Sequence, residues 1–362
     1  MILGEESLKR VPSEFVVQRD DVANPPAFFY LMDLFLKDKG FVEEHMESLK
    51  KLHPRMRLWF KWLMSSQKAS KSGLFRWRGR LENLDTELNP KTLASGLDDY
   101  PRATNPTHQE YHLDLKCWMM MSSQVMSKFD KIVNTNNLDQ LFEELGGDDY
   151  SEYSFLKENH WDPQGQMFAD YGLHSTDVYL KQTLYRDQNG YVQSQTKREF
   201  RRAPKQQFVT NAFGYVNLFP LLLKQIPPNA PELEITLKKL GDGNATWSKY
   251  GLRSVSKTSP YYGAKNTEHD PGYWRGYIWI NLNYMALSAL NHYGSVEGPY
   301  REMSLQLFTD LRTNIINLIS NEYNRTGYVF ENYDDSTGMG QGTRPFNGWS
   351  SLVLVIMSGD FS

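Results

Sequence analysis

Two acidic segments, far apart in the sequence, carry residue types that could do chemistry. Residues 95–102 read SGLDDYPR and contain Asp98 and Asp99, and residues 327–334 read GYVFENYD and contain Glu331. Both segments set carboxylates beside glycine and aromatic residues. Two carboxylates that meet from distant loops in an aromatic pocket are what hydrolysis of a glycosidic bond requires. The sequence therefore suggests a site that cleaves sugars.

Each segment also has a plainer interpretation. Pro101 disfavours a helical conformation at Tyr100, so we expect a loop that presents Asp98 and Asp99 beside Arg102. From residue types alone we favour a structural role here, in which an aspartate caps a helix or forms an Asx-turn beside a surface arginine. In the same way, Glu331 could be an exposed side chain on a short strand.

A third group consists of Glu110 and Asp114, which are four residues apart and would share one face of a helix. Thr107 and Glu110 match a capping box, which predicts a helix over 107–132. On spacing alone we favour this structural role over a pair of acids that face a pocket.

Residues 270–279 read DPGYWRGYIW and place four aromatic rings around Arg275. This density is more typical of the wall of a site than of a helix cap. Sugar rings pack their C–H faces against aromatic side chains, so Tyr273 and Trp274 fit a saccharide site.

Composition excludes several other classes of function. The 362 residues carry a net charge of −3, so no basic field indicates nucleic acid or anionic lipid as a partner. Cys117 is the only cysteine, which rules out an intrachain disulfide. Zinc-binding, nucleotide-binding and serine-hydrolase motifs are missing, so we expect neither a metal nor a cofactor.

Targeting signals are equally sparse. We see no signal peptide and no apolar run long enough to span a membrane. Asn244 and Asn324 begin two N-glycosylation sequons, a pattern that arises often by chance.

The elements that must position these residues are predicted to be helices. Eight to ten helices in antiparallel pairs, no strand alternation and no repeat indicate one all-α domain. The main expected helices are 26–37, 43–66 with a break at Pro54, 107–132, 135–157, 207–219, 274–293, 299–323 and 346–357. Residues 184–206 are expected to be a surface loop, 338–342 a flexible loop, and the 26–37 helix to be buried nearly all round.

Four stretches, in order, resemble one enzyme family. They are ELNPKTLASGLDDYPRA at 87–103, EYHLDLKCW at 110–118, residues 268–284, and the ENY, GMG and RPFNGWSSL pieces between 331 and 352. These motifs are similar to those of glycoside hydrolase family 63, the processing α-glucosidase I group. The resemblance runs over most of the chain.

The resemblance implies an (α/α)6 barrel that inverts configuration without a metal or cofactor. It implies that Asp98 is the general acid and Glu331 the general base. The substrate would be the terminal α-1,2-linked glucose of the triglucosylated N-glycan precursor in the endoplasmic reticulum lumen. Residues implied as substrate-binding or supporting are Asp99, Arg102, Glu110, Asp114, Tyr273, Trp274, Arg275 and Trp349.

Physical chemistry adds expectations to this resemblance. An inverting pair needs its carboxyl groups ~6.5–9.5 Å apart, so that a water fits behind the sugar. The charge of Asp99 should raise the pKa of Asp98, and Arg102 would oppose that shift if it came close.

Family members also carry a membrane anchor, a β-sandwich domain and the first barrel helices upstream, which these 362 residues do not show. We therefore expect residues 1–362 to form one partial barrel domain. Two other functions remain open: a non-catalytic remnant that binds a glycan or a protein partner, and a trehalase-like helical-barrel hydrolase.

Overall fold

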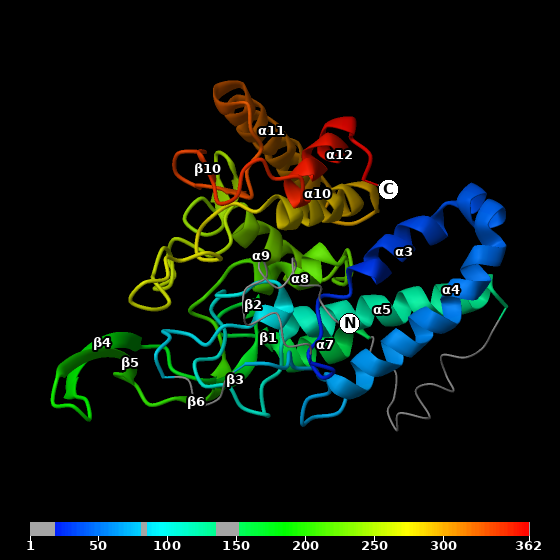
Figure 1. Cartoon of the computed structure of the whole chain (residues 1–362). Helices are drawn as coiled ribbons and strands as arrows, with labels where there is room; N and C mark the ends of the chain where they lie inside the picture. Colours follow the sequence, from blue (N-terminus) through cyan, green and yellow to red (C-terminus); the bar gives the residue numbers. More distant parts are fainter. Residues whose placement is uncertain (1–18, 81–84, 135–151, 362) are drawn as a thin grey trace, which may run out of the picture.

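The computed structural model describes residues 19–80, 85–134 and 152–361, and helices dominate this part of the chain (Figure 1). The α-helices are α3 (Ala27–Lys37), α4 (Lys39–Ser66), α5 (Leu113–Ile132), α7 (Tyr153–His160), α8 (Tyr215–Leu222), α9 (Pro231–Leu240), α10 (Ile280–Ser295), α11 (Arg301–Thr326) and α12 (Val353–Ser358). The 3-10 turn η1 (Leu93–Ser95) leads directly into the first acidic segment, and the 3-10 turn η2 (Trp349–Leu352) follows the second.

The core lies where α5, α8 and α10 meet. Nearly all of α5 is buried, including polar Asp114 and Lys116, and every residue of α8 is buried. Helix α5 packs against α3, α4 and α8, while α10 packs against α8 and α11, as their neighbouring ribbons show (Figure 1). A helix that is apolar all round must lie inside such a core, and this accounts for α8.

Helices α3 and α11 lie where the sequence predicts them, but the expected break in α4 is misplaced. The helix continues through Pro54, and its non-helical residue is His45. Proline removes one backbone hydrogen bond. The buried contacts of Leu49 and Met56, on either side of Pro54, hold the helix together across that loss.

Three predicted helices begin too early. Helix α5 starts at Leu113, α8 at Tyr215 with Pro220 inside it, and α10 at Ile280. In each case a residue just before the helix pairs with another segment: Tyr111 bridges Tyr171, Gly214 bridges Val255, and Ile278 bridges Tyr333. The apolar residues in these stretches indicate burial, but a short apolar run does not distinguish a helix from a strand, so the predicted helices start too early.

The helix-rich fold that the sequence predicts is confirmed, but strands lie between the helices. Most of the surface loop predicted at 184–206 belongs to the hairpin of β4 (Val178–Arg186) and β5 (Val192–Phe200), which projects from the body (Figure 1). Solvent bathes most of both faces, so the hairpin lacks the alternation that reveals a half-buried strand. The short strands are β1 (Trp161–Asp162), β2 (Met167–Phe168), β3 (Tyr171–His174), β6 (Lys205–Phe208), β7 (Trp247–Ser248), β8 (Gly251–Leu252), β9 (Asn332–Tyr333) and β10 (Gly340–Gln341).

Smaller corrections follow. The predicted 338–342 loop is ordered as part of the antiparallel β9–β10 pair, and the closing helix begins as η2 before α12. Most of the predicted 135–157 helix lies outside the described residues. Helix α3 is not buried all round, because Phe28 and Leu31 are 66% and 40% exposed.

No helix within 19–80, 85–134 and 152–361 combines the length and apolarity that crossing a bilayer requires.

Helix α11 ends at a glycine whose conformation can be tested. Gly327 adopts φ +76°, and its N–H donates to Tyr323 O at 2.7 Å. We expect Gly327→Ala to lower the free energy of unfolding by roughly 1 kcal/mol, because an L-residue is strained in this left-handed region. Urea denaturation measures the difference. Gly243→Ala is the control, since open space surrounds Gly243 and its φ lies outside that region. Equal stability of both variants would contradict the assignment.

Candidate active site

The first acidic segment forms a tight loop after η1. Gly96 ends η1 with φ +71°, a conformation that glycine adopts without strain. The N–H of Thr92 donates to Asp98 O at 2.7 Å, and the Tyr100 hydroxyl donates to Ala212 O at 2.8 Å. The loop is therefore fixed on both sides of its acids. Asp98 remains partly exposed, whereas Asp99 is buried.

Asp99 joins this loop to the aromatic segment at 270–279. Its carboxylate accepts the N–H of Tyr273 at 2.9 Å and the N–H of Trp274 at 2.6 Å. The Arg275 guanidinium donates to Asp99 O at 2.9 Å and lies 3.5 Å from the carboxylate. Hydrogen bonds to a charged group contribute about 1.5–3 kcal/mol each, so this joint is strong.

Glu331 is attached to the same aromatic segment. The Tyr273 hydroxyl donates to Glu331 Oε1 at 2.5 Å, and the N–H of Thr343 donates to Oε2 at 3.1 Å. Trp349 Nε1 donates to Glu331 O at 2.7 Å. A Cβ at Gly342 would lie 2.4 Å from Oε2, so glycine permits this close approach of the backbone. Tyr273 thus connects both acidic segments, through its backbone to Asp99 and through its hydroxyl to Glu331.

The surroundings of Asp98 favour its protonated form. Burial raises the pKa of Asp98 to about 6, and the charges of Asp99 and Glu331 add to that rise, while Lys91 opposes it. The expected repulsion from Asp99 is present, but burial is the larger cause. Arg102 is engaged with Asp114 and Asp170 instead, so its expected opposition does not arise. Burial and the bond to Glu331 also raise the pKa of Tyr273 far above its usual value, which keeps the hydroxyl protonated as a donor.

Aromatic rings form the wall beside these acids. Trp274 and Trp279 stack with centroids 3.7 Å apart, and Tyr273 meets the edge of Trp279 at 4.6 Å. Trp349 lies 5.8 Å from Trp279. Trp274 and Trp279 are buried, whereas Tyr273 and Trp349 are partly exposed. The buried pair therefore supports two rings that a ligand can touch.

A buried ion network lies beneath the acid loop. Arg102 donates to both oxygens of Asp114, at 3.0 and 2.6 Å, and to Asp170 at 2.9 Å. Trp77 Nε1 also donates to Asp114, and Asp170 accepts the N–H of Leu113 at 2.7 Å, which satisfies the start of α5. Burial alone would raise the pKa of Asp114, but Arg102 outweighs it and the pKa is lowered.

Glu110 is not part of a capping box, because α5 starts three residues after it. Instead its carboxylate pairs with Arg80, and both side chains are almost fully buried. Burial raises the pKa of Glu110 and lowers the pKa of neighbouring His112 to about 3. Glu110 and Asp114 therefore do not share a helix face.

The structure brings most of the predicted site residues together. These are Asp98, Asp99, Tyr273, Trp274, Arg275, Glu331 and Trp349. Arg102, Glu110, Asp114 and Arg275 are at most 1% exposed and Trp274 is 2% exposed, so in this conformation these five residues support the site and do not touch a ligand.

Sequence reasoning missed several residues that build the site. Lys91 and Trp279 lay inside the segments already singled out, so position within them was an available signal. No sequence signal pointed to Asp170 or Arg80, because their ion-pair partners lie far from them in the sequence. In the described ranges, no group of three or more His, Cys, Asp or Glu residues could hold a metal ion.

Comparison with known proteins identifies the family. A model of the glycosyl hydrolase family 63 C-terminal domain matches residues 1–359. The chain belongs to glycoside hydrolase family 63. It is 42% identical over 374 residues to the mannosyl-oligosaccharide glucosidase GCS1 of Arabidopsis thaliana, covering 99% of this chain and 43% of that protein. The probable mannosyl-oligosaccharide glucosidase of Schizosaccharomyces pombe is 30% identical, with 99% and 44% covered.

The family resemblance of the four sequence segments is thereby confirmed. The chain spans less than half of the length of these curated relatives. The solved structure of the GH63 mannosylglycerate hydrolase from Thermus thermophilus in complex with glucose aligns with a TM-score of 0.59 and 15% identity, over 93% of this chain and 76% of that one. At this identity the alignment shows a shared fold alone.

The buried network can be tested through stability. We expect Arg102→Met to lower the free energy of unfolding by roughly 3–5 kcal/mol, because Asp114 and Asp170 would remain buried without their partner. Lys238→Met is the control, since Lys238 pairs with Glu234 on the surface and should change stability by less than ~1 kcal/mol. Urea denaturation followed by tryptophan fluorescence measures both. Similar losses in the two variants would mean that burial of the network contributes little.

Proposed function

We propose that this chain is the catalytic part of an inverting exo-α-glucosidase that uses Asp98 as general acid and Glu331 as general base. One observation carries the proposal. Two carboxyl groups from distant loops are attached to Tyr273. Asp98, whose pKa is raised to about 6, is attached through its neighbour Asp99, and Glu331 is attached through the Tyr273 hydroxyl. Environments that separate the roles of two carboxyl groups are typical of glycosidases.

The reaction follows from these roles. Asp98 donates its proton to the glycosidic oxygen as the bond from that oxygen to the anomeric carbon breaks. Glu331 takes a proton from a water, whose oxygen attacks the anomeric carbon from the opposite face of the sugar. The product is glucose of inverted configuration, and the leaving oligosaccharide carries the proton from Asp98. Tyr273 holds Glu331 in place, while Trp349 offers a ring to the sugar.

The proposed substrate is the terminal α-1,2-linked glucose of a triglucosylated N-glycan precursor. Support comes from proteins named mannosyl-oligosaccharide glucosidase that align along the whole chain. On this proposal, residues 1–362 are one partial (α/α)6-barrel domain, and the reaction takes place in the endoplasmic reticulum lumen. Asp99, Trp274 and Arg275 then position the site, and Arg102, Glu110 and Asp114 support it from beneath.

Two alternatives are separated by substrate and turnover. A non-catalytic remnant would bind the glycan and release no glucose. A trehalase-like enzyme would prefer the free disaccharide. A partial alignment with the mannosylglycerate hydrolase of Thermus thermophilus, 32% identical over 109 residues, makes mannosylglycerate a third substrate to compare.

The roles of the two acids can be tested by proton NMR with an α-1,2-glucosyl-capped oligosaccharide. We expect β-glucose to appear first, and Asp98→Asn and Glu331→Gln each to reduce kcat roughly 10³-fold, because each loses one proton-transfer step. Asp310→Asn, the same chemical change on the exposed face of α11, should keep full activity. α-Glucose as the first product would contradict inversion. No glucose from the folded parent chain would favour the remnant.

The pH dependence tests the acid by itself. Asp98 has a raised pKa, so it keeps its proton up to about pH 6 and loses it above that value. We expect kcat/KM to fall about tenfold per pH unit above pH 6, or about 100-fold by pH 8. Lys91 lowers the pKa of Asp98, so Lys91→Met should move this decline to higher pH. A decline that stays in place in Lys91→Met would show that another group titrates.

A further inference from the structure

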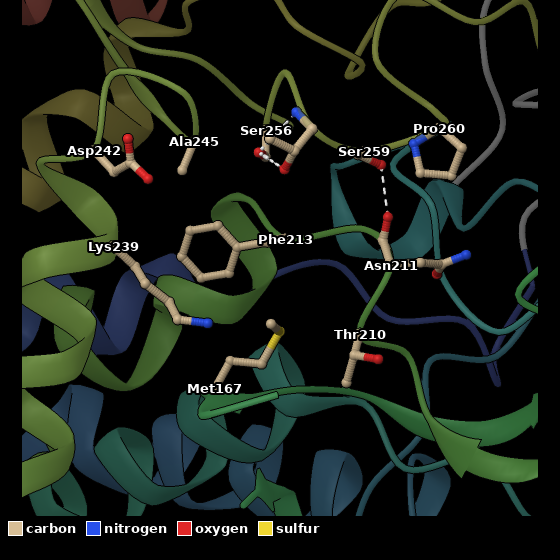
Figure 2. Close-up of a pocket in the computed structure, with 11 residues that line it drawn as sticks. Met167, Thr210, Asn211, Phe213, Lys239, Asp242, Ala245, Ser256, Ser259 and Pro260 are labelled. Carbon is tan, nitrogen blue, oxygen red and sulfur yellow. Dashed lines mark hydrogen bonds between the residues drawn. The ribbon is translucent and has the colours of Figure 1, made fainter. Parts of the chain in front are cut away.

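A cavity of about 280 Å³ lies beside the end of α9, and none of the catalytic acids lines it. Figure 2 shows the residues around it, which come from α9, from strand β2 and from the loops after α9, β6 and β8. We call it the α9 pocket, and the six residues that matter for its chemistry are Met167, Thr210, Phe213, Lys239, Asp242 and Thr258. Its volume is near the lower end of the range for small-molecule sites, a size that suits one or two sugar rings.

The α9 pocket combines an aromatic face with two opposite charges. The Lys239 ammonium lies 5.4 Å from the centroid of the Phe213 ring. Asp242 follows three residues later, just beyond the end of α9, and is exposed. In Figure 2 the Phe213 ring lies between Lys239 and the hydroxyl-bearing residues of the opposite wall.

Several polar atoms around the α9 pocket retain hydrogen-bonding capacity. Lys239 donates one of its three N–H groups to Gly165 O at 2.7 Å, which leaves two. Asp242 Oδ1 accepts the N–H of Asn244 at 2.8 Å, and Oδ2 stays available. The Thr210 hydroxyl has no hydrogen-bond partner within the described ranges. The pocket therefore offers donors, acceptors and an apolar ring together.

We propose that the α9 pocket is a second binding site for a neutral saccharide, separate from the catalytic acids. Sugars present C–H faces to a ring and hydroxyl groups to charged and hydroxyl side chains, which matches Phe213, Lys239 and Asp242. An anion would meet the charge of Asp242, and an apolar ligand would leave Asp242 and Lys239 without partners. The assignment to a saccharide rests on the proposed function, in which the chain processes a branched glycan.

The α9 pocket and the acid loop contact the same backbone segment. Asn211 and Phe213 line the pocket, whereas Ala212 between them belongs to a small buried cluster, and its carbonyl accepts the Tyr100 hydroxyl. Tyr100 is two residues from Asp98. We infer that sugar bound in the pocket adds affinity for the glycan without taking part in bond cleavage.

The methyl group of Met167 provides a direct readout of this site. The whole chain, labelled with ¹³C-methyl methionine, is titrated with methyl α-D-mannopyranoside, and the Met167 signal is assigned through Met167→Leu. We expect a saturable shift of this signal in the parent chain and an equal shift in Asp98→Asn. The apparent Kd should rise at least tenfold in Lys239→Met and in Asp242→Asn.

Lys238→Met is the matched control, because Lys238 is the preceding residue on α9, is exposed and pairs with Glu234. It should bind the sugar as tightly as the parent chain. No saturable shift, or equal affinity in Lys239→Met and Lys238→Met, would overturn the proposal. A shift produced by free glycine instead of the sugar would also overturn it, since a zwitterion would then be the ligand. A chain that shows the shift but releases no glucose would refute the proposed function alone.

Discussion

The rest of the site depends on the hydrogen bonds that the Asp99 carboxylate accepts from the aromatic segment at 270–279. This carboxylate accepts two consecutive backbone N–H groups, from Tyr273 and Trp274, and lies beside the guanidinium of Arg275. These bonds fix the aromatic segment against the acid loop although the two are more than 170 residues apart. Because Tyr273 also holds Glu331, the position of this distant carboxylate is determined through the same interaction.

The buried ion network of Arg102, Asp114 and Asp170 joins the acid loop to α5. Asp170 accepts the first N–H of α5 and pairs with Arg102, which in turn holds Asp114 inside α5. A buried ion pair adds little net stability over apolar residues, but removing one partner is costly. The network therefore specifies the register between the loop and the helix, which an apolar contact would leave less well defined.

Sequence analysis was most reliable where a signal is local. The apolar period over 299–323 predicted α11 to within three residues at each end, and the aromatic density around Arg275 indicated the cluster of rings that the structure shows. It failed where distant partners decide the outcome. Thr107 looked like a helix cap, yet Asp170, far along the chain, supplies the acceptor for α5. Likewise Glu110 and Asp114 suggested one helix face, whereas their arginine partners place them in separate buried pairs.

The same charge that joins the two segments also adjusts the acid. Asp99 needs its negative charge to bind two N–H groups and Arg275, and it lies next to Asp98 in the sequence. Its charge adds to the effect of burial and raises the pKa of Asp98 to about 6. The position and the protonation of Asp98 are therefore coupled. Without a charged neighbour, Asp98 would have a lower pKa and would lose its proton at lower pH. One side chain thus meets two requirements of the proposed inverting site.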